Sequence, residues 1–229
     1  VTNANSMWLN DKPFKKDLET ALKREVKLMN DANCFTLSEA VDGAGKDYQS
    51  IFGIIIGTGF GGALSYKKEI IEGANQIAGD WGHQPLPYPT KEEIETKINC
   101  PSMNCGRPLC AEQFMSGIGF KDVFNQKHNT NFSSEEIVQL DLDGDPRASL
   151  ELSLYEDRMA RLMAVMIGIF DPDAIILGGG MSNIDRLYKN IPVLIPKYTF
   201  SNKVITKVIK NFHGDSSGVR GAAWLWNNV

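Results

Sequence analysis

The stretch Ala174–Ile175–Ile176–Leu177–Gly178–Gly179–Gly180 decides the fold class of this chain. Its four apolar residues form a short run that is typical of a buried strand, and the three glycines predict a tight turn directly after it. A strand, a glycine turn and a helix together favour phosphate binding, because N–H groups at a helix N-terminus point at the anion. We therefore expect an α/β protein, with Gly178, Gly179 and Gly180 as candidate nucleotide-binding residues.

A second glycine turn follows a second predicted strand. Residues 52–56 are rich in isoleucine, and Gly57–Thr58–Gly59–Phe60–Gly61–Gly62 separates them from a returning strand at residues 63–66. This pattern predicts a hairpin whose turn lets the backbone approach a ligand closely. Each glycine turn is weak evidence alone, and neither continues into the Gly-Lys-Ser/Thr of a Walker loop. Together they suggest two sides of a nucleotide pocket, with Gly57, Thr58, Gly59, Gly61 and Gly62 on the hairpin side.

The remaining pattern is mainly helical. Helices are predicted over residues 14–28, 34–41, 114–124, 133–140, 157–170 and 218–226, and a further strand over residues 204–209. Residues 72–108 are rich in Gly and Pro and are expected to be irregular. So long an irregular stretch needs another source of order.

A metal site would supply that order. Cys100, Cys105 and Cys110 have the even spacing C-x4-C-x4-C, and His83 precedes them. One imidazole and three thiolates are a tetrahedral zinc set with no open position for water, so the predicted role is structural. The alternatives are ordinary loop cysteines or part of a disulfide set, but three clustered thiols leave one unpaired and Cys34 lies in another segment. Reduced, metal-bound cysteines indicate a cytoplasmic protein.

Composition excludes several function classes. The 229 residues are 42% hydrophobic and 23% charged, with a net charge of −4. No cluster of Lys and Arg compensates locally, so nucleic acid is not an expected partner. No apolar run approaches the roughly 18 residues of a membrane span, so a membrane is not expected either.

Short polar residues form the candidate catalytic centre. Asp31 lies in Asn30–Asp31–Ala32–Asn33, a pattern that by itself favours an Asx turn or helix N-cap. The functional alternative is a carboxylate that takes a proton from a hydroxyl nucleophile. Asp80, His83 and Glu112 bracket the cysteine loop and could accept hydrogen bonds from sugar hydroxyls, or could simply be solvated surface groups.

These residues together resemble the ROK sugar kinases, most closely the bacterial fructokinase (mannofructokinase) branch. The resemblance spans essentially the whole chain. It rests on Asn3–Ala4–Asn5–Ser6 with Trp8, residues 30–33, residues 57–64, Ala78–Gly79–Asp80–Trp81–Gly82–His83, Cys105–Gly106 and Cys110–Ala111–Glu112, Asp171–Pro172–Asp173 with residues 178–182, and residues 213–226.

The resemblance implies an actin-like ATPase (ribonuclease H-like) fold of two α/β domains, with sugar and ATP meeting in the cleft between them. Residues 1–50 would be the remainder of the N-terminal domain. Residues 51–229 would be the C-terminal domain, with a zinc-binding loop at about residues 80–112 and a closing C-terminal helix. Family members often dimerise, so the resemblance also implies a homodimer.

The resemblance assigns roles to the candidate residues. Asp31 would be the general base as the sugar hydroxyl attacks the γ-phosphate of Mg-ATP. Asn5, Asn30, Asp80, His83 and Glu112 would hold the sugar. Residues 57–64 would wrap the phosphates, residues 178–180 would lie on the nucleoside side, and His83, Cys100, Cys105 and Cys110 would bind zinc.

The implied activity is ATP-dependent conversion of fructose to fructose 6-phosphate, with ATP, Mg²⁺ and a structural zinc. The enzyme alternative is a kinase for N-acetylglucosamine or glucose. The alternatives from other classes are a sugar-sensing transcriptional regulator and a non-catalytic sugar-binding fragment. An intact Asp31 favours an enzyme, because a sensor needs no base.

Three departures from the family pattern bear on these expectations. The family usually has Glu where this chain has Asp80, which shortens the reach to the sugar by about 1.5 Å. The zinc cysteines are spaced more widely at the start than in the common C-x-C-G-x-x-G-C form. The Asp-x-Gly-Gly-Thr-Lys-like phosphate loop that begins the family is not found, so we expect a truncated N-terminal domain and a poor kinase in this form.

Overall fold

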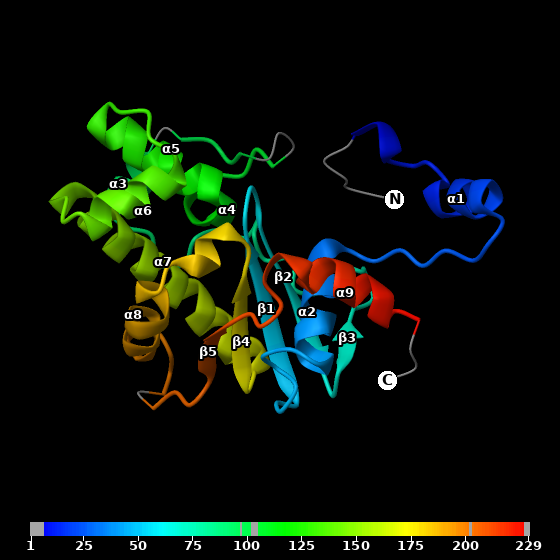
Figure 1. Cartoon of the computed structure of the whole chain (residues 1–229). Helices are drawn as coiled ribbons and strands as arrows, with labels where there is room; N and C mark the ends of the chain where they lie inside the picture. Colours follow the sequence, from blue (N-terminus) through cyan, green and yellow to red (C-terminus); the bar gives the residue numbers. More distant parts are fainter. Residues whose placement is uncertain (1–6, 97, 102–104, 202, 227–229) are drawn as a thin grey trace.

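The computed structural model describes residues 7–96, 98–101, 105–201 and 203–226 (Figure 1). Within these residues, one mixed sheet has the strand order β3-β2-β1-β4-β5. Its strands are β1 (Ser50–Ile56), β2 (Phe60–Tyr66), β3 (Glu69–Ile71), β4 (Ala174–Gly178) and β5 (Lys207–Lys210). β1 is antiparallel to β2 and parallel to β4. The two predicted glycine turns therefore leave neighbouring strands at the same edge of the sheet.

Helices cover both faces of this sheet. The α-helices are α1 (Phe14–Leu22), α2 (Asp31–Val41), α3 (Lys91–Glu95), α4 (Ala111–Met115), α5 (Gly117–His128), α6 (Ser134–Leu142), α7 (Pro146–Phe170), α8 (Arg186–Leu194) and α9 (Ser217–Trp224). The 3-10 helices are η1 (Met7–Leu9), η2 (Gly180–Asn183), η3 (Ile195–Lys197) and η4 (Gly214–Ser216).

Alternation along β1 separates two apolar layers. Phe52, Ile54 and Ile56 belong to the large core that includes the buried face of α7. Ile51 belongs instead to a smaller core with Phe35 of α2. This period of two is what a strand with helices on both faces requires. Figure 1 shows α2 and α9 together on one side of the sheet.

Helix α2 approaches its neighbours very closely because glycines face it on two sides. A Cβ added at Gly53 of β1 would lie 2.0 Å from the Thr36 Oγ1 atom of α2, and one at Gly221 of α9 would lie 1.7 Å from the carbonyl oxygen of Cys34. The buried Glu39 carboxylate accepts hydrogen bonds from the backbone N–H of Phe212 and other donors that lead into α9. Helix α2 is thus fixed between the sheet and the C-terminal helix.

The irregular stretch expected at residues 72–108 is confirmed for its described residues, apart from the short helix α3. This helix begins at a capping box between Thr90 and Glu93. The Glu93 carboxylate is buried and accepts hydrogen bonds from Arg158 and Arg161 of α7 at 2.8 and 2.7 Å. A buried charge is tolerated only when it is paired in this way. The ion pairs therefore hold the irregular stretch against the long helix.

Several predicted elements differ in extent. The helix expected over residues 14–28 ends at Leu22, because Lys23 takes the left-handed conformation and α1 buries none of its residues. The helix expected over residues 114–124 is interrupted at Ser116, whose hydroxyl caps α5 by accepting from the N–H of Gly119. The hairpin of residues 52–66 is confirmed, and so is the strand at residues 174–177.

The domain boundary expected at residue 50 stays a prediction. Helix α2 lies before that boundary, and its buried side chains Phe35 and Ala40 pack with β1 and β4 residues that lie after it. The two parts thus share a small apolar core.

The buried ion cluster gives a test of this packing. Burial raises the pKa of Glu93, but hydrogen bonds from Arg161, Arg158 and the Thr90 backbone lower it further than burial raises it. A carboxylate with a depressed pKa stabilises the fold above its unfolded pKa, and that contribution is lost as pH falls through the folded value. Glu93→Gln should therefore lower the free energy of unfolding at pH 7 by about 3 kcal/mol. Urea unfolding curves should show that the difference in free energy of unfolding between wild type and variant becomes smaller in acid. An equal difference in free energy of unfolding at neutral and acid pH would contradict this account.

Candidate active site

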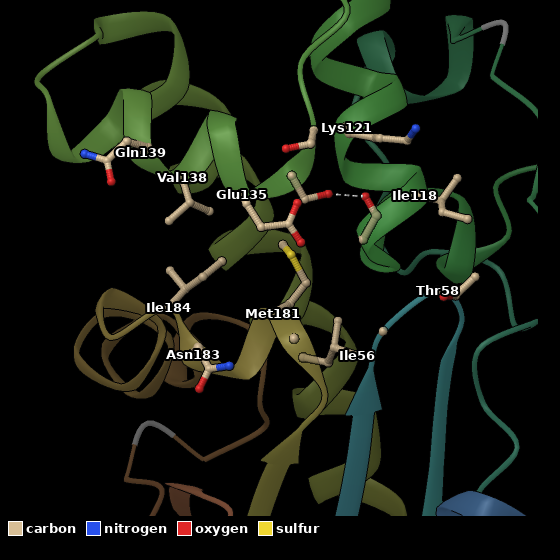
Figure 2. Close-up of a pocket in the computed structure, with 15 residues that line it drawn as sticks. Ile56, Thr58, Ile118, Lys121, Glu135, Val138, Gln139, Met181, Asn183 and Ile184 are labelled. Carbon is tan, nitrogen blue, oxygen red and sulfur yellow. Dashed lines mark hydrogen bonds between the residues drawn. The ribbon is translucent and has the colours of Figure 1, made fainter. Parts of the chain in front are cut away.

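The two glycine turns line one pocket. Its volume is about 640 Å³, within the range of small-molecule sites. The lining residues are Ile56, Gly57, Thr58, Gly117, Ile118, Lys121, Ser133, Ser134, Glu135, Val138, Gln139, Gly180, Met181, Asn183 and Ile184 (Figure 2). The pocket thus lies between the β1–β2 turn, the helices α5 and α6, and the 3-10 helix η2.

The three glycines of the 178–180 turn meet different constraints. A Cβ at Gly178 would lie 2.3 Å from the Phe35 ring, and Gly179 has φ of +81° and lies against the carbonyl of Ile56. A Cβ at Gly180 would meet nothing within 4 Å, and the same holds at Gly57. Gly178 and Gly179 are therefore required by packing and backbone conformation. Gly57 and Gly180 instead leave open space on the pocket wall, which is where a bulky anion could approach the backbone.

Thr58 also lines the pocket, whereas Gly59, Gly61 and Gly62 lie away from that wall. A Cβ at Gly62 would meet the Phe52 ring at 2.7 Å, so Gly62 is a packing position within β2. Gly59 faces the Glu112 carboxylate, and Gly61 faces the Cβ of Ala32 at 3.9 Å. The beginning of β2 is thus flanked by Glu112 on one side and by the first turn of α2 on the other.

Asp31 is the first residue of α2, and its side chain is exposed. The N-cap is the preceding Asn30, whose Oδ1 atom accepts hydrogen bonds from the N–H groups of Ala32 and Asn33 at 2.8 and 3.3 Å. The Asp31 Oδ1 atom also accepts from the Ala32 N–H, at 2.9 Å. The capping interpretation therefore holds for Asn30, and Asp31 is left as an exposed carboxylate at the N-terminal end of a helix.

Glu112 is the buried member of the predicted sugar-binding set. It lies in the first turn of α4, and its Oε2 atom accepts a hydrogen bond from the Phe60 N–H at 3.1 Å. Asp80 is exposed in the turn that precedes Trp81, and Trp81 packs against Phe60 with ring centroids 5.0 Å apart. The structure therefore brings the segments that carry Asp80 and Glu112 to the beginning of β2. Asn5 lies outside the described residues.

His83 and the three cysteines come together as predicted. One ligand atom from each of His83, Cys100, Cys105 and Cys110 lies within 4.8 Å of the others. The Cys110 sulfur is 3.3 Å from the Cys100 sulfur, 3.5 Å from that of Cys105 and 3.5 Å from His83 Nδ1. Zinc–sulfur bonds of 2.3 Å in a tetrahedron place neighbouring sulfurs about 3.8 Å apart. The cluster therefore fits a four-coordinate zinc ion with only small adjustments.

Burial opposes ionisation of one thiol of this cluster. It raises the pKa of the Cys110 thiol to about 11. Only a thiolate is a good zinc ligand, so metal binding would release this proton. With His83 Nδ1 directed at the cluster, the Nε2 atom is the nitrogen left to meet a hydroxyl group.

Several pocket residues were not predicted from the sequence. Lys121 of α5, Glu135 of α6 and Met181 and Ile184 near η2 all line the pocket. Their patterns look like those of ordinary surface or core positions. Lys121 and Glu135 follow Ser116 and Ser133, the caps that begin α5 and α6, and Met181 and Ile184 follow the 178–180 glycine turn.

Among the described residues, none of the helices is both long and apolar enough to cross a membrane.

The family follows from comparison with known proteins, since the model of the ROK family matches residues 1–229. This chain belongs to the ROK family. ROK relatives include the N-acetyl-D-glucosamine kinase of Vibrio atlanticus (strain LGP32), 39% identical over 93% of this chain and 71% of that protein. The N-acetyl-D-glucosamine kinase of Vibrio cholerae is 38% identical over 98% of this chain and 74% of that protein. The predicted ROK membership is thereby confirmed, whereas these relatives give no specific support to the fructokinase branch.

Solved ROK structures confirm the actin-like ATPase fold. The ROK hexokinase from Thermus thermophilus superposes with a TM-score of 0.81 at 24% identity, covering 94% of this chain and 69% of that one. A ROK glucokinase from Streptomyces griseus, solved with glucose and AMPPNP, gives 0.79 at 23% identity, covering 94% and 72%. A ROK transcriptional regulator homologous to the E. coli MLC protein gives 0.76 at 20% identity, covering 91% and 53%. Since kinases and a regulator share it, this ROK fold alone does not decide between them.

The glycines at 178 and 180 give a matched pair of variants for testing the pocket of this ROK protein. Gly180→Ala adds a methyl group that meets open space, so we expect unchanged thermal stability and several-fold weaker binding of Mg-ADP. Gly178→Ala adds a methyl group against Phe35, so it should destabilise the fold by about 1–3 kcal/mol. Calorimetric titration and thermal melting separate the two effects. An unchanged ADP affinity in Gly180→Ala would show that the nucleotide does not bind beside Gly180.

The metal cluster gives a second test. Elemental analysis of the purified ROK chain should find about one zinc per molecule, the stoichiometry of a four-ligand structural site. Cys110→Ala should lose the metal and melt at a lower temperature, because metal binding contributes to folding. Cys34→Ala, which alters a cysteine outside the cluster, should keep the metal. A folded wild-type protein without metal would refute the zinc site.

Proposed function

We propose that this ROK protein is an ATP-dependent kinase of N-acetylglucosamine. The observation that carries the proposal is the 38% identity to the Vibrio cholerae N-acetyl-D-glucosamine kinase over 98% of this chain. Fructose, the substrate implied by the initial resemblance, has no comparable support. The alternative named beside it, N-acetylglucosamine, therefore becomes the main proposal.

The nucleotide would lie in the pocket between the two glycine turns. Its phosphates would approach Gly57 and Gly180, where the missing side chains leave room beside the backbone. The apolar residues Val138 and Ile184 would contact the base end. Mg²⁺ bound with the ATP would neutralise part of the phosphate charge during transfer.

Asp31 would act at the sugar side of the β1–β2 turn. Gly61 of that hairpin lies against Ala32, so the first turn of α2 adjoins the segment that follows the phosphate turn. In the proposed step, a sugar hydroxyl oxygen forms a bond to the γ-phosphorus while the bond to the ADP oxygen breaks, and the hydroxyl proton passes to the Asp31 carboxylate. The N-terminal end of α2 also carries a partial positive charge that favours nearby phosphate.

Asn5, Asn30, Asp80, His83 and Glu112 remain the proposed contacts to the sugar. The zinc set of His83 and three cysteines has four protein ligands, which leaves no position for a reacting water. Its proposed role is therefore to order the loop that carries His83 and ends at Glu112.

A sugar-sensing regulator is the second candidate, and the similar fold of the MLC-homologous regulator is the observation that favours it. Asp31 separates the two candidates in chemical terms. A sensor binds sugar without proton transfer, so it gains nothing from an exposed carboxylate at this helix end.

The proposal is tested by measuring ATP-dependent phosphorylation of N-acetylglucosamine, glucose and fructose. Because the resemblance implies a further phosphate loop, the assay uses both the 229-residue chain and an N-terminally extended form. We expect kcat/KM for N-acetylglucosamine to exceed that for fructose by at least about 10-fold, as a site with polar contacts to a specific group can discriminate. Asp31→Asn should lower kcat by about 10²–10⁴-fold with little change in sugar affinity.

Asp17→Asn serves as the control for Asp31→Asn, because it removes the same charge from an exposed position on α1. Turnover of fructose equal to that of N-acetylglucosamine would remove the substrate assignment. Sugar binding without turnover in both forms would favour the regulator.

A further inference from the structure

Glu135 lines the pocket, and its carboxylate takes no part in capping its helix. It lies in the first turn of α6, yet the capping box of that helix is made by its neighbours Ser133 and Glu136. In the part of the chain that the structure describes, the Glu135 side chain has no hydrogen bond or ion pair. Figure 2 shows its carboxylate directed into the pocket, toward Met181. Such a group is available for a ligand.

Glu135 is held at a fixed place relative to the β1–β2 turn. The N–H of Gly117 donates to the Gly57 carbonyl at 2.8 Å, and the Gly117 carbonyl accepts from the Ser134 hydroxyl at 2.7 Å. These two hydrogen bonds connect the turn to the residue that precedes Glu135. The carboxylate is therefore positioned by the same contacts that fix the proposed phosphate end of the pocket.

The order of groups along the pocket points to a particular part of the nucleotide. In Figure 2, Thr58 lies at one end and Val138 and Ile184 lie at the other, with Glu135 between them. In a nucleotide, the ribose lies between the phosphates and the base. We propose that Glu135 accepts hydrogen bonds from the ribose 2′- and 3′-hydroxyls and so selects ribonucleotides. This inference rests on the proposed function, which places ATP in this pocket.

The chemistry of the carboxylate suits this role. An ionised carboxylate only accepts hydrogen bonds and has two oxygens, which matches two adjacent hydroxyl donors. It also lies in the first turn of α6, the end of a helix that carries partial positive charge. Lys121 of α5 lines the same pocket and also has no ion pair among the described residues, so its charge offsets the repulsion between Glu135 and the phosphates.

The test is equilibrium binding of Mg-ADP, Mg-2′-deoxy-ADP and Mg-3′-deoxy-ADP to the 229-residue chain. Wild type should bind ADP about 10-fold more tightly than the deoxy analogues, the effect of one hydrogen bond to a charged group. Glu135→Ala should bind all three with nearly equal affinity. Glu135→Gln, which keeps one acceptor oxygen, should show an intermediate preference for ADP over the deoxy analogues. It replaces Glu135→Ala in the test if that variant does not fold.

Glu136→Gln is the matched control. It removes the same charge from the same helical turn, and Gln can still complete a capping box. It should keep the wild-type preference for ADP, so a general charge effect on phosphate binding is separated from recognition of ribose. A preference that survives in Glu135→Ala, or is absent in wild type, overturns the inference.

The measurement also separates the two proposals. ADP binding without discrimination among the analogues would refute the role of Glu135 and leave the kinase proposal intact. Absence of binding by all three nucleotides would refute both the role of Glu135 and the placement of ATP in this pocket. Discrimination that depends on Glu135, together with no turnover of any sugar, would support the ribose contact and refute the kinase.

Discussion

The backbone of the β1–β2 turn is the element on which the rest of the site depends. Its Gly57 carbonyl accepts a hydrogen bond from the first residue of α5, and the N–H of Phe60 donates to the Glu112 carboxylate. The neighbouring carbonyl of Ile56 lies against Gly179 of the other glycine turn. These contacts come from three separate segments of the chain and involve mostly main-chain atoms. The pocket wall is therefore set by backbone geometry, so the side chains around it can differ between relatives that share the fold.

The position of Asp31 follows from a second backbone constraint. Helix α2 can lie close to both the sheet and α9 because Gly53 and Gly221 carry no side chain at the points of contact. A helix fixed on two sides presents its first residue in a defined place, and Asp31 is that residue. Proton transfer depends on such placement, since a small displacement of the base strongly reduces its efficiency. The C-terminal helix thus contributes to the proposed site without touching a substrate.

The sequence was sufficient for β1, β2 and β4, both glycine turns and the cysteine cluster, because each of these has a strong local signature. It missed β3, and β5 begins at Lys207 instead of the expected residue 204. It was not sufficient for α7, which begins at Pro146 instead of the expected residue 157. Glu151, Arg158 and Arg161 look like solvent-facing charges, whereas the structure buries them. Glu93, the partner of Arg158 and Arg161, lies 65 and 68 residues away from them in an irregular stretch, so local periodicity could not identify the pairing. The same limit applies to Glu135, whose relation to Gly57 depends on hydrogen bonds between distant segments.

Glu112 connects the parts of the site that were predicted separately. One carboxylate oxygen accepts from the Phe60 N–H at the β1–β2 turn, and the other lies 3.6 Å from the Cys100 sulfur of the metal cluster. The residue proposed to contact the sugar is therefore already engaged with both the turn and the metal loop. A carboxylate has enough lone pairs to serve several donors at once. Consequently, the order of the cysteine loop and the conformation of the β1–β2 turn both determine which oxygen of Glu112 a sugar hydroxyl can reach. In the proposed kinase, sugar preference would then be a property of the whole loop, which explains why no single residue of the sequence indicated it.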